Sequence, residues 1–256
     1  MKLKNTLAFA IGLFVLSSCI DNGAAELIDF TPFVPADDTT YVDLDTLQNA
    51  TPQPKNVLIE DFTGVKCSNC PDAAKRIKDI KVANPDRVVS IGIHTGDESF
   101  THPKSGYSKY DFRTADGDRL GSLVGPIKGL PTGAVDRTYF EDAEPPAILI
   151  NRLLWDAKTS ERLNENNPVN ISITSQKNDG EELIFLVRVL YEELVSDEDH
   201  FLSVYITEDE VVDYQYDWQI GDIKDYKHEH IFRKNLTSTQ GDSLVVSNVE
   251  NPYVEG

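Results

Sequence analysis

Two cysteines, Cys67 and Cys70, are separated by two residues and followed directly by Pro71. This spacing lets both sulfur atoms meet across the first turn of a helix, where a proline is tolerated because its missing N–H has no partner to lose. The unpaired N–H groups and the positive end of the helix dipole favour a thiolate at the first cysteine. We therefore expect an exposed nucleophile at Cys67 and a sheltered resolving thiol at Cys70, with a static structural disulfide as the alternative.

A carboxylate precedes this pair. Asp61 lies six residues before Cys67, inside the apolar run 57–62. On a strand covered by helices, burial would raise the pKa of Asp61, which could then accept the proton of Cys70. The alternative is a solvated Asp61 at the strand end, with Glu60 turned inward. Lys66, directly before the first cysteine, would also favour the thiolate unless its side chain points into water.

A proline opens a later strand-like run, in the sequence Gly129-Leu130-Pro131-Thr132. The order of strand, turn, C-x-x-C, helix and a strand opened by X-Pro resembles the assembly of a thioredoxin-type site. That resemblance implies a cis Pro131 that faces the cysteines, with the backbone before it pairing with an extended substrate segment. A trans proline that opens an edge strand is the alternative.

The first twenty residues have the form of a bacterial lipoprotein signal. A basic start is followed by the apolar stretch 7–16, which is too short to span a bilayer, and by Leu16-Ser17-Ser18-Cys19, which matches a lipobox. We expect cleavage after residue 18 and acylation of Cys19, which would anchor the chain to a membrane. An ordinary signal peptide cleaved elsewhere is the alternative. With Cys19 lipidated, an exported chain keeps two usable thiols, and this favours a redox pair over a disulfide scaffold.

Acidic side chains dominate the composition. The formal net charge is −19, and it becomes −21 when Lys2 and Lys4 leave with residues 1–18. No basic patch remains, so nucleic-acid binding is disfavoured. The expected partners are envelope proteins or a redox partner reached through disulfide exchange, together with the membrane that holds the lipid anchor.

No metal and no cofactor are expected. Copper could be bound by Cys67, Cys70 and His94. A second possible ligand pair is His228 and His230, at positions i and i+2 of a predicted strand. However, His94 ends a predicted buried strand, and a His-x-His pair in a β region is more often a packing or surface feature than a ligand pair.

Four segments follow from the changes in pattern along the chain. Residues 1–18 form the signal peptide and 19–54 an acidic flexible tether. Residues 55–166 alternate strand-like and helix-like stretches, which predicts an α/β thioredoxin-like domain. From 167 to 256 the hydrophobic period changes from 3.6 to 2, which is typical of an all-β meander or sandwich. Five or six strands fit there, so the sandwich would be small or truncated.

Individual elements can be assigned within the α/β segment. The predicted strands are 57–62, 87–94 and the pair within 131–140, and the predicted helices are 71–83, 112–124 and 146–163.

Five motifs in this order resemble the outer membrane protein 28-related lipoproteins of Gram-negative bacteria. They are 58–64 before the C-x-x-C, Tyr110–Thr114, Gly129–Gly133, Leu202–Glu210 and Lys227–Arg233. The resemblance covers most of the chain from Cys19 onward. It implies an outer-membrane lipoprotein that faces the periplasm or the cell surface, with a thioredoxin-like domain followed by an immunoglobulin-like one. It supports architecture more than activity, because members mostly have no assigned reaction. The tryptophan that precedes the first cysteine in thioredoxin is absent here.

Two functions fit these observations. The first is a lipid-anchored thiol–disulfide oxidoreductase that acts on envelope proteins. The second is a non-enzymatic surface lipoprotein, a binding module in which Cys67–Cys70 is a static disulfide.

Overall fold

The computed structural model describes residues 53–95, 98–177, 182–191 and 199–244. The predicted signal peptide, Cys19 and nearly all of the predicted tether lie outside these residues. The chain divides into two compact units, Met1–Val42 with Thr174–Leu186 and Asp43–Ile173 with Val187–Gly256. The second unit contains the central sheet and the site described below. Within the described ranges, no helix is long and apolar enough to cross a membrane.

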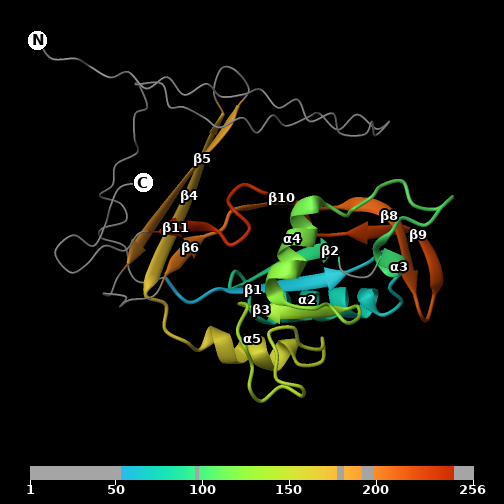
Figure 1. The fold of residues 1–256 in the computed structure, drawn as a ribbon, viewed down its shortest axis with the longest axis horizontal. Helices are drawn as coiled ribbons and strands as arrows, with labels where there is room; N and C mark the ends of the chain where they lie inside the picture. Colours follow the sequence, from blue (N-terminus) through green and yellow to red (C-terminus); the bar gives the residue numbers. More distant parts are fainter. Residues whose placement is uncertain (1–52, 96–97, 178–181, 192–198, 245–256) are drawn as a thin grey trace, which may run out of the picture. The chain divides into compact units, whose positions relative to one another are not determined.

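A five-stranded sheet lies at the centre of the second unit, in the order β3-β1-β2-β10-β7 (Figure 1). β1 (Val57–Thr63) and β2 (Val88–His94) run parallel, and β3 (Thr132–Val135) pairs antiparallel with β1. Parallel strands need a crossover connection, and α2 (Cys70–Ala83) supplies it between β1 and β2.

The remaining two strands of this sheet come from far along the chain. β10 (Ile231–Asn235) is parallel to β2, and β7 (Tyr205–Glu208) is antiparallel to β10. The sheet therefore takes strands from both sides of residue 167.

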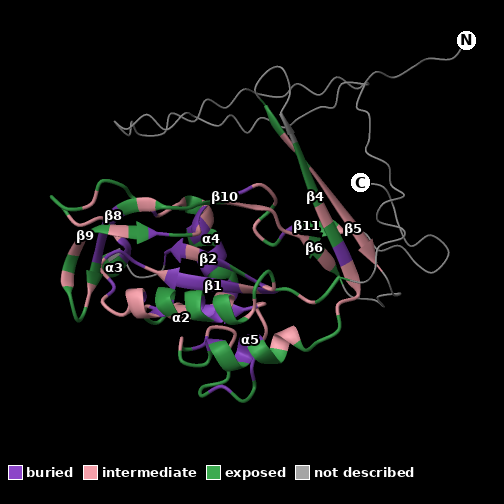
Figure 2. Ribbon diagram, turned by 180° about the vertical axis from the view of Figure 1, so that it is seen from behind, coloured by how far each residue is buried: buried purple, intermediate pink, exposed green. Residues whose placement is uncertain are grey.

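Both faces of β1 and β2 are covered, which explains their nearly continuous apolar sequence (Figure 2). One face packs against α2 and α5 (Trp155–Leu163), and the other against α4 (Ala115–Val124). The first cluster includes Val57, Ile59, Ile77, Ile80 and Trp155. The second includes Phe62, Ile91, Ile93, Leu120 and Phe232.

The helix after the cysteines ends as predicted, at Asn84 before Pro85. Its buried side chains include Ala73, Ile77 and Ile80, whereas Ala74 is exposed. The predicted helix at 112–124 begins three residues later than expected, because the side chain of Thr114 caps it by accepting a hydrogen bond from Gly117 N at 2.9 Å.

The predicted helix 146–163 is too long. α5 begins at Trp155, and Leu153, inside the predicted range, is 61% exposed. The reason lies in residues 146–154, which form bends, a turn and isolated bridges rather than a helix. Ile150 forms a bridge with Gly133 of β3, in which each backbone N–H donates to the carbonyl of the other residue.

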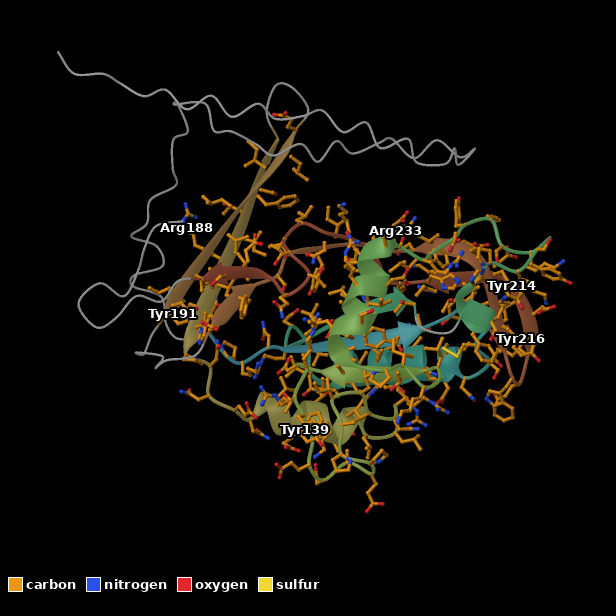
Figure 3. The ribbon with its side chains drawn as sticks, viewed as in Figure 1. Tyr139, Arg188, Tyr191, Tyr214, Tyr216 and Arg233 are labelled. Carbon is orange, nitrogen blue, oxygen red and sulfur yellow. A yellow bond between two sulfur atoms is a disulfide. The ribbon has the colours of Figure 1, made fainter. Side chains whose placement is uncertain are left out.

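The described strands of 167–256 do not form the predicted immunoglobulin-like sandwich. Two of them extend the central sheet, and the others form separate pairs. These pairs are β4 (Val169–Lys177) with β5 (Leu183–Tyr191), β6 (His200–Leu202) with β11 (Asp242–Leu244), and β8 (Val211–Asp217) with β9 (Gly221–His228). Tyr214 and Tyr216 lie on β8 (Figure 3). Alternation shows which side chains share a face, but not which strand pairs with which, and this is why the prediction failed.

Candidate functional site

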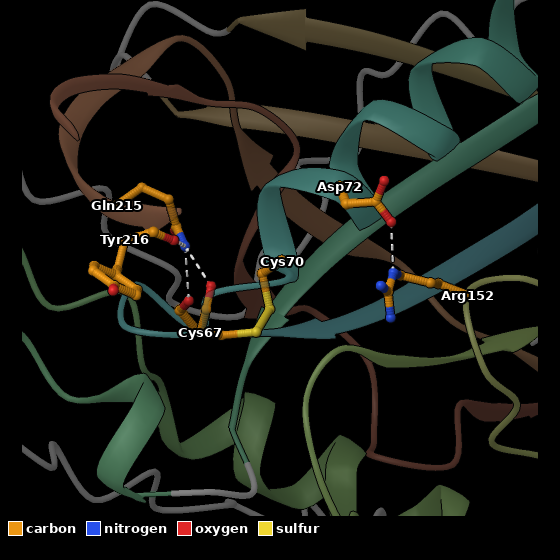
Figure 4. The surroundings of a disulfide bond; sticks show 7 residues. Cys67, Cys70, Asp72, Arg152, Gln215 and Tyr216 are labelled. Carbon is orange, nitrogen blue, oxygen red and sulfur yellow. Dashed lines mark hydrogen bonds and ion pairs between the residues drawn. A yellow bond between two sulfur atoms is a disulfide. The ribbon is translucent and has the colours of Figure 1, made fainter. Parts of the chain in front are cut away.

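Cys67 and Cys70 form a disulfide at the start of α2, with their Cα atoms 5.4 Å apart (Figure 4). Each cysteine is 3% exposed. The expectation of an exposed Cys67 beside a sheltered Cys70 is therefore wrong for this disulfide-bonded state. The physical reason is that two elements, one on each side, hold the loop that carries Cys67.

β8 lies along one side of this loop. The side-chain amide of Gln215, itself buried, donates to the backbone carbonyls of Gly64 at 3.2 Å and Cys67 at 3.1 Å. Figure 4 shows these two hydrogen bonds beside the disulfide. Because the carbonyl oxygens at the cysteine turn are satisfied by a side chain from another element, the turn is fixed in place.

β8 and the residue after it also form backbone hydrogen bonds with the cysteine loop. Tyr216 N donates to Val65 O at 2.8 Å, and Trp218 N donates to Ser68 O at 3.1 Å. The Trp218 side chain is 60% exposed. A strand from the C-terminal part of the chain thus covers the cysteine loop and places an exposed aromatic residue next to it.

α3 (Glu98–Thr101) lies against the loop as well. The N–H of Lys66 donates to Phe100 O at 2.9 Å. A Cβ on Gly64 would come within 2.7 Å of that same carbonyl oxygen, so only glycine fits there. Lys66 itself is half-buried.

Asp61 is buried on the β1 face that α2 covers, and it is 5% exposed. Its Oδ1 has no hydrogen-bond partner among the described residues. Burial raises the pKa of Asp61 to about 8. The predicted burial and pKa shift are therefore confirmed, while a role as proton acceptor stays a prediction.

Glu60 is buried too, on the opposite face of β1, and is 1% exposed. Arg137 donates to both of its carboxylate oxygens at 2.7 Å, and also donates to the Tyr205 hydroxyl at 3.0 Å. Neither carboxylate is solvated, so the predicted burial of Asp61 is correct, and so is the inward Glu60 of the alternative. The two carboxylates differ in whether a cation pairs with them.

A cavity of about 780 Å³ lies on the α2 side of the sheet. Asp61 and Cys70 both line it, together with Gln215, His94 and His228. Cys70 and the Asp61 carboxyl group therefore border one space.

His94 and His228 belong to an aromatic cluster, with their ring centroids 6.2 Å apart and Phe112 within 5.0 Å of each ring. Burial lowers the pKa of His94 to about 3 and that of His228 to about 4, so both rings are neutral at pH 7. His230 instead contacts Asp209, with Nδ1 and Oδ1 2.8 Å apart. Across the described ranges, no three His, Cys, Asp or Glu side chains converge as metal ligands.

The Leu130–Pro131 peptide bond is cis, as predicted, and Pro131 is buried. Thr132, the next residue, pairs with Phe62 near the end of β1. The loop to Cys67 leaves from that end of β1, so both chain segments begin at the same end of this strand.

Gln215 and the contact made by β8 were not found from the sequence. The available signal was the pair of polar residues Asp213 and Gln215 on one face of a strand-like run. Both are buried, and the carboxylate of Asp213 accepts hydrogen bonds from the backbone N–H groups of Lys109 and Tyr110.

The family model for outer membrane protein Omp28 matches residues 126–253. A search of curated proteins found no match. Among solved structures, the chain is similar to HBP35 of Porphyromonas gingivalis, with a TM-score of 0.56 and 20% identity over 76% of this chain and 60% of that one. A protein of Agrobacterium tumefaciens matches with a TM-score of 0.44 and 11% identity over 76% and 74% of the two chains.

The likeness to HBP35 concerns the fold alone, and HBP35 is thioredoxin-like. This agrees with a parallel β1-α2-β2 unit whose first strand pairs with an antiparallel strand that follows a cis proline. The family match begins at residue 126, so it includes Pro131 and β8 but not the two cysteines. Since it spans half of the sequence, the chain belongs to the outer membrane protein Omp28 family.

Proposed function

We propose that this protein carries out thiol–disulfide exchange on envelope proteins while anchored to a membrane through an acylated Cys19. The observation that carries the proposal is the placement of the Cys67–Cys70 disulfide at the start of α2, where Cys70 shares a cavity with the unpaired Asp61 carboxyl group.

The exchange balances without a cofactor. A substrate thiolate attacks the sulfur of Cys67, the Cys67–Cys70 bond breaks, and Cys70 leaves as a thiolate that takes the proton of the neutral Asp61 carboxyl group. A second substrate thiolate then attacks the mixed disulfide and releases the Cys67 thiolate. Two electrons pass from the substrate to the protein, and the substrate gains a disulfide.

The reverse direction uses the same atoms. The Cys67 thiolate attacks a substrate disulfide, and the Asp61 carboxylate accepts the proton of Cys70 as Cys70 displaces the substrate. A pKa of about 8 suits Asp61 to both roles, because protonated and ionised forms are both populated near neutral pH.

A second function, a binding module with a static disulfide, is favoured by one observation. Both cysteines are 3% exposed, and Gln215 holds the carbonyl of Cys67. In that case the disulfide fixes the start of α2, and the exchange chemistry is not used.

The experiment compares Cys70→Ser with Cys67→Ser in cells, with Cys19 retained. Attack through Cys67 predicts that Cys70→Ser traps covalent adducts with envelope proteins, which appear on gels run without reductant and disappear with reductant. Cys67→Ser should trap almost none. Equal absence of adducts from both variants favours the static disulfide.

The reduction potential of the pair provides an independent measurement. A static disulfide is expected below about −300 mV, and a catalytic one among the oxidoreductases. For the anchor, Cys19→Ser should abolish palmitate labelling and release the protein from the membrane fraction, and unchanged labelling would contradict it.

A further inference from the structure

The cavity beside α2 has a polar inner end and an apolar middle. Its inner end is lined by Asp61, His94 and Gln215, each of which is no more than 5% exposed. The apolar part of its wall includes the side chains of Ile77 and Ile231. A volume of about 780 Å³ is in the range of small-molecule sites.

Two buried polar atoms at the inner end lack partners. Oδ1 of Asp61 and Nδ1 of His94 have no hydrogen-bond partner among the described residues, although both residues line the cavity. Buried polar groups are nearly always paired, because an unpaired one costs about 1 to 3 kcal/mol. A ligand group that both donates and accepts, such as a hydroxyl, would satisfy both atoms.

Lysines and acidic residues, among them Asp86 and Glu229, both line the outer part of the cavity. Lys78 and Lys81, on α2, line it, and Lys78 has no ion-pair partner in the described part of the chain. Nζ of Lys81 lies 2.6 Å from Nε2 of His230. From Cys70 to Lys78 the helix axis rises about 12 Å, at about 1.5 Å per residue. The wall that α2 contributes between Cys70 and Lys78 is thus roughly as long as a medium acyl chain.

We propose that this cavity binds a free amphipathic organic anion, with its charge at Lys78 and Lys81, an apolar body along α2, and a hydrogen-bonding group at Asp61 and His94. This site overlaps the proposed exchange site, because Asp61 and Cys70 border the same cavity, but no thiol takes part in the binding.

The probes are 12-hydroxydodecanoate and, as its matched control, dodecanoate, which lacks only the inner hydroxyl group. Binding of each to the full chain is measured by isothermal titration calorimetry below the micelle concentration. The hydroxy acid should bind at least about five-fold more tightly, because it satisfies groups that the plain acid leaves unpaired.

Three variants locate the site. Asp61→Leu should remove the preference for the hydroxy acid, and Lys78→Glu should weaken both probes at least about five-fold. Lys128→Glu makes the same charge change at an exposed residue outside the cavity and should leave both affinities unchanged. Equal affinities for the two acids in the unaltered protein, no binding of either, or equal effects of Lys78→Glu and Lys128→Glu would overturn the proposal.

Discussion

Glu60 and Asp61 are neighbours on one strand, and both are buried, but their carboxylates differ in their hydrogen-bond partners. Glu60 faces the α4 side and accepts two hydrogen bonds from Arg137. Asp61 faces the α2 side, borders a cavity, and has no hydrogen-bond partner for Oδ1 among the residues that the structure describes. Both side chains are almost fully buried, so burial alone does not separate them.

This difference indicates which of the two carboxyl groups can exchange protons. A paired buried charge is satisfied in one protonation state and acts mainly on stability and specificity. An unpaired buried carboxyl group is costly to ionise, so its pKa moves toward the range in which it can exchange protons. The α4 face is therefore the structural face of the sheet, and the α2 face contains the candidate site.

The largest effect should come from Asp61→Asn on stability at alkaline pH. The pKa of Asp61 is raised in the folded state, so wild-type stability is fully present below pH 4 and is lost as the pH rises through about 8. Asn cannot ionise, and the variant should be more stable than the wild type at pH 9 by on the order of 5 kcal/mol, with little difference at pH 4. Urea unfolding of both proteins across this range measures it. A pH-independent difference would contradict the unpaired state of Asp61.

Glu60→Gln should have the opposite sign. It leaves the largely buried Arg137 without its counter-charge and should cost about 3 kcal/mol, with no change between pH 6 and 9. Asp79→Asn is the matched control, because Asp79 pairs with Lys75 where both side chains are more than 60% exposed, and its loss should cost less than about 0.5 kcal/mol. Equal costs in urea unfolding would show that the Glu60 pair is not special.

Asp61→Asn should also slow exchange. If the carboxyl group accepts the proton of Cys70 and not that of Cys67, as proposed, the resolution of a mixed disulfide should slow by about 100-fold at pH 7, while the first attack stays within about two-fold. Rapid quenching and separation of the mixed disulfide follow the two steps. Equal slowing of both steps would leave Asp61 with a structural role only.

The smallest effect is expected from Gln215→Ala. It removes the donor to the carbonyls of Gly64 and Cys67 and should cost about 1 to 2 kcal/mol. The disulfide should then react several-fold faster with dithiothreitol, because the loop is less firmly held. Gln219→Ala, in the exposed turn after β8, is the control and should change neither quantity. An unchanged reduction rate for Gln215→Ala would show that β8 does not shield the disulfide.

Local features of this site were predictable because they are encoded by neighbouring residues. The start of α2 follows from Pro71, its end from Asn84-Pro85, and the burial of Asp61 from the apolar run around it. The cis form of Pro131 followed from a resemblance. The later helix was misplaced because proline-flanked residues pair with β3 instead of continuing α5.

Several features could be predicted from the amino-acid sequence alone: the helix that follows the C-x-x-C, the buried carboxyl group, and the mixed α/β character of the segment that carries them. These depend on periodicity, capping and spacing over a few residues. Only the tertiary structure decided that β7 and β10 join the central sheet and that β8 supplies Gln215 to the cysteine loop. It also decided that Glu60 is paired and Asp61 is not. Segments this far apart in the chain pair according to the shape and the free hydrogen-bonding groups of the folded surface. Local sequence patterns do not contain this information.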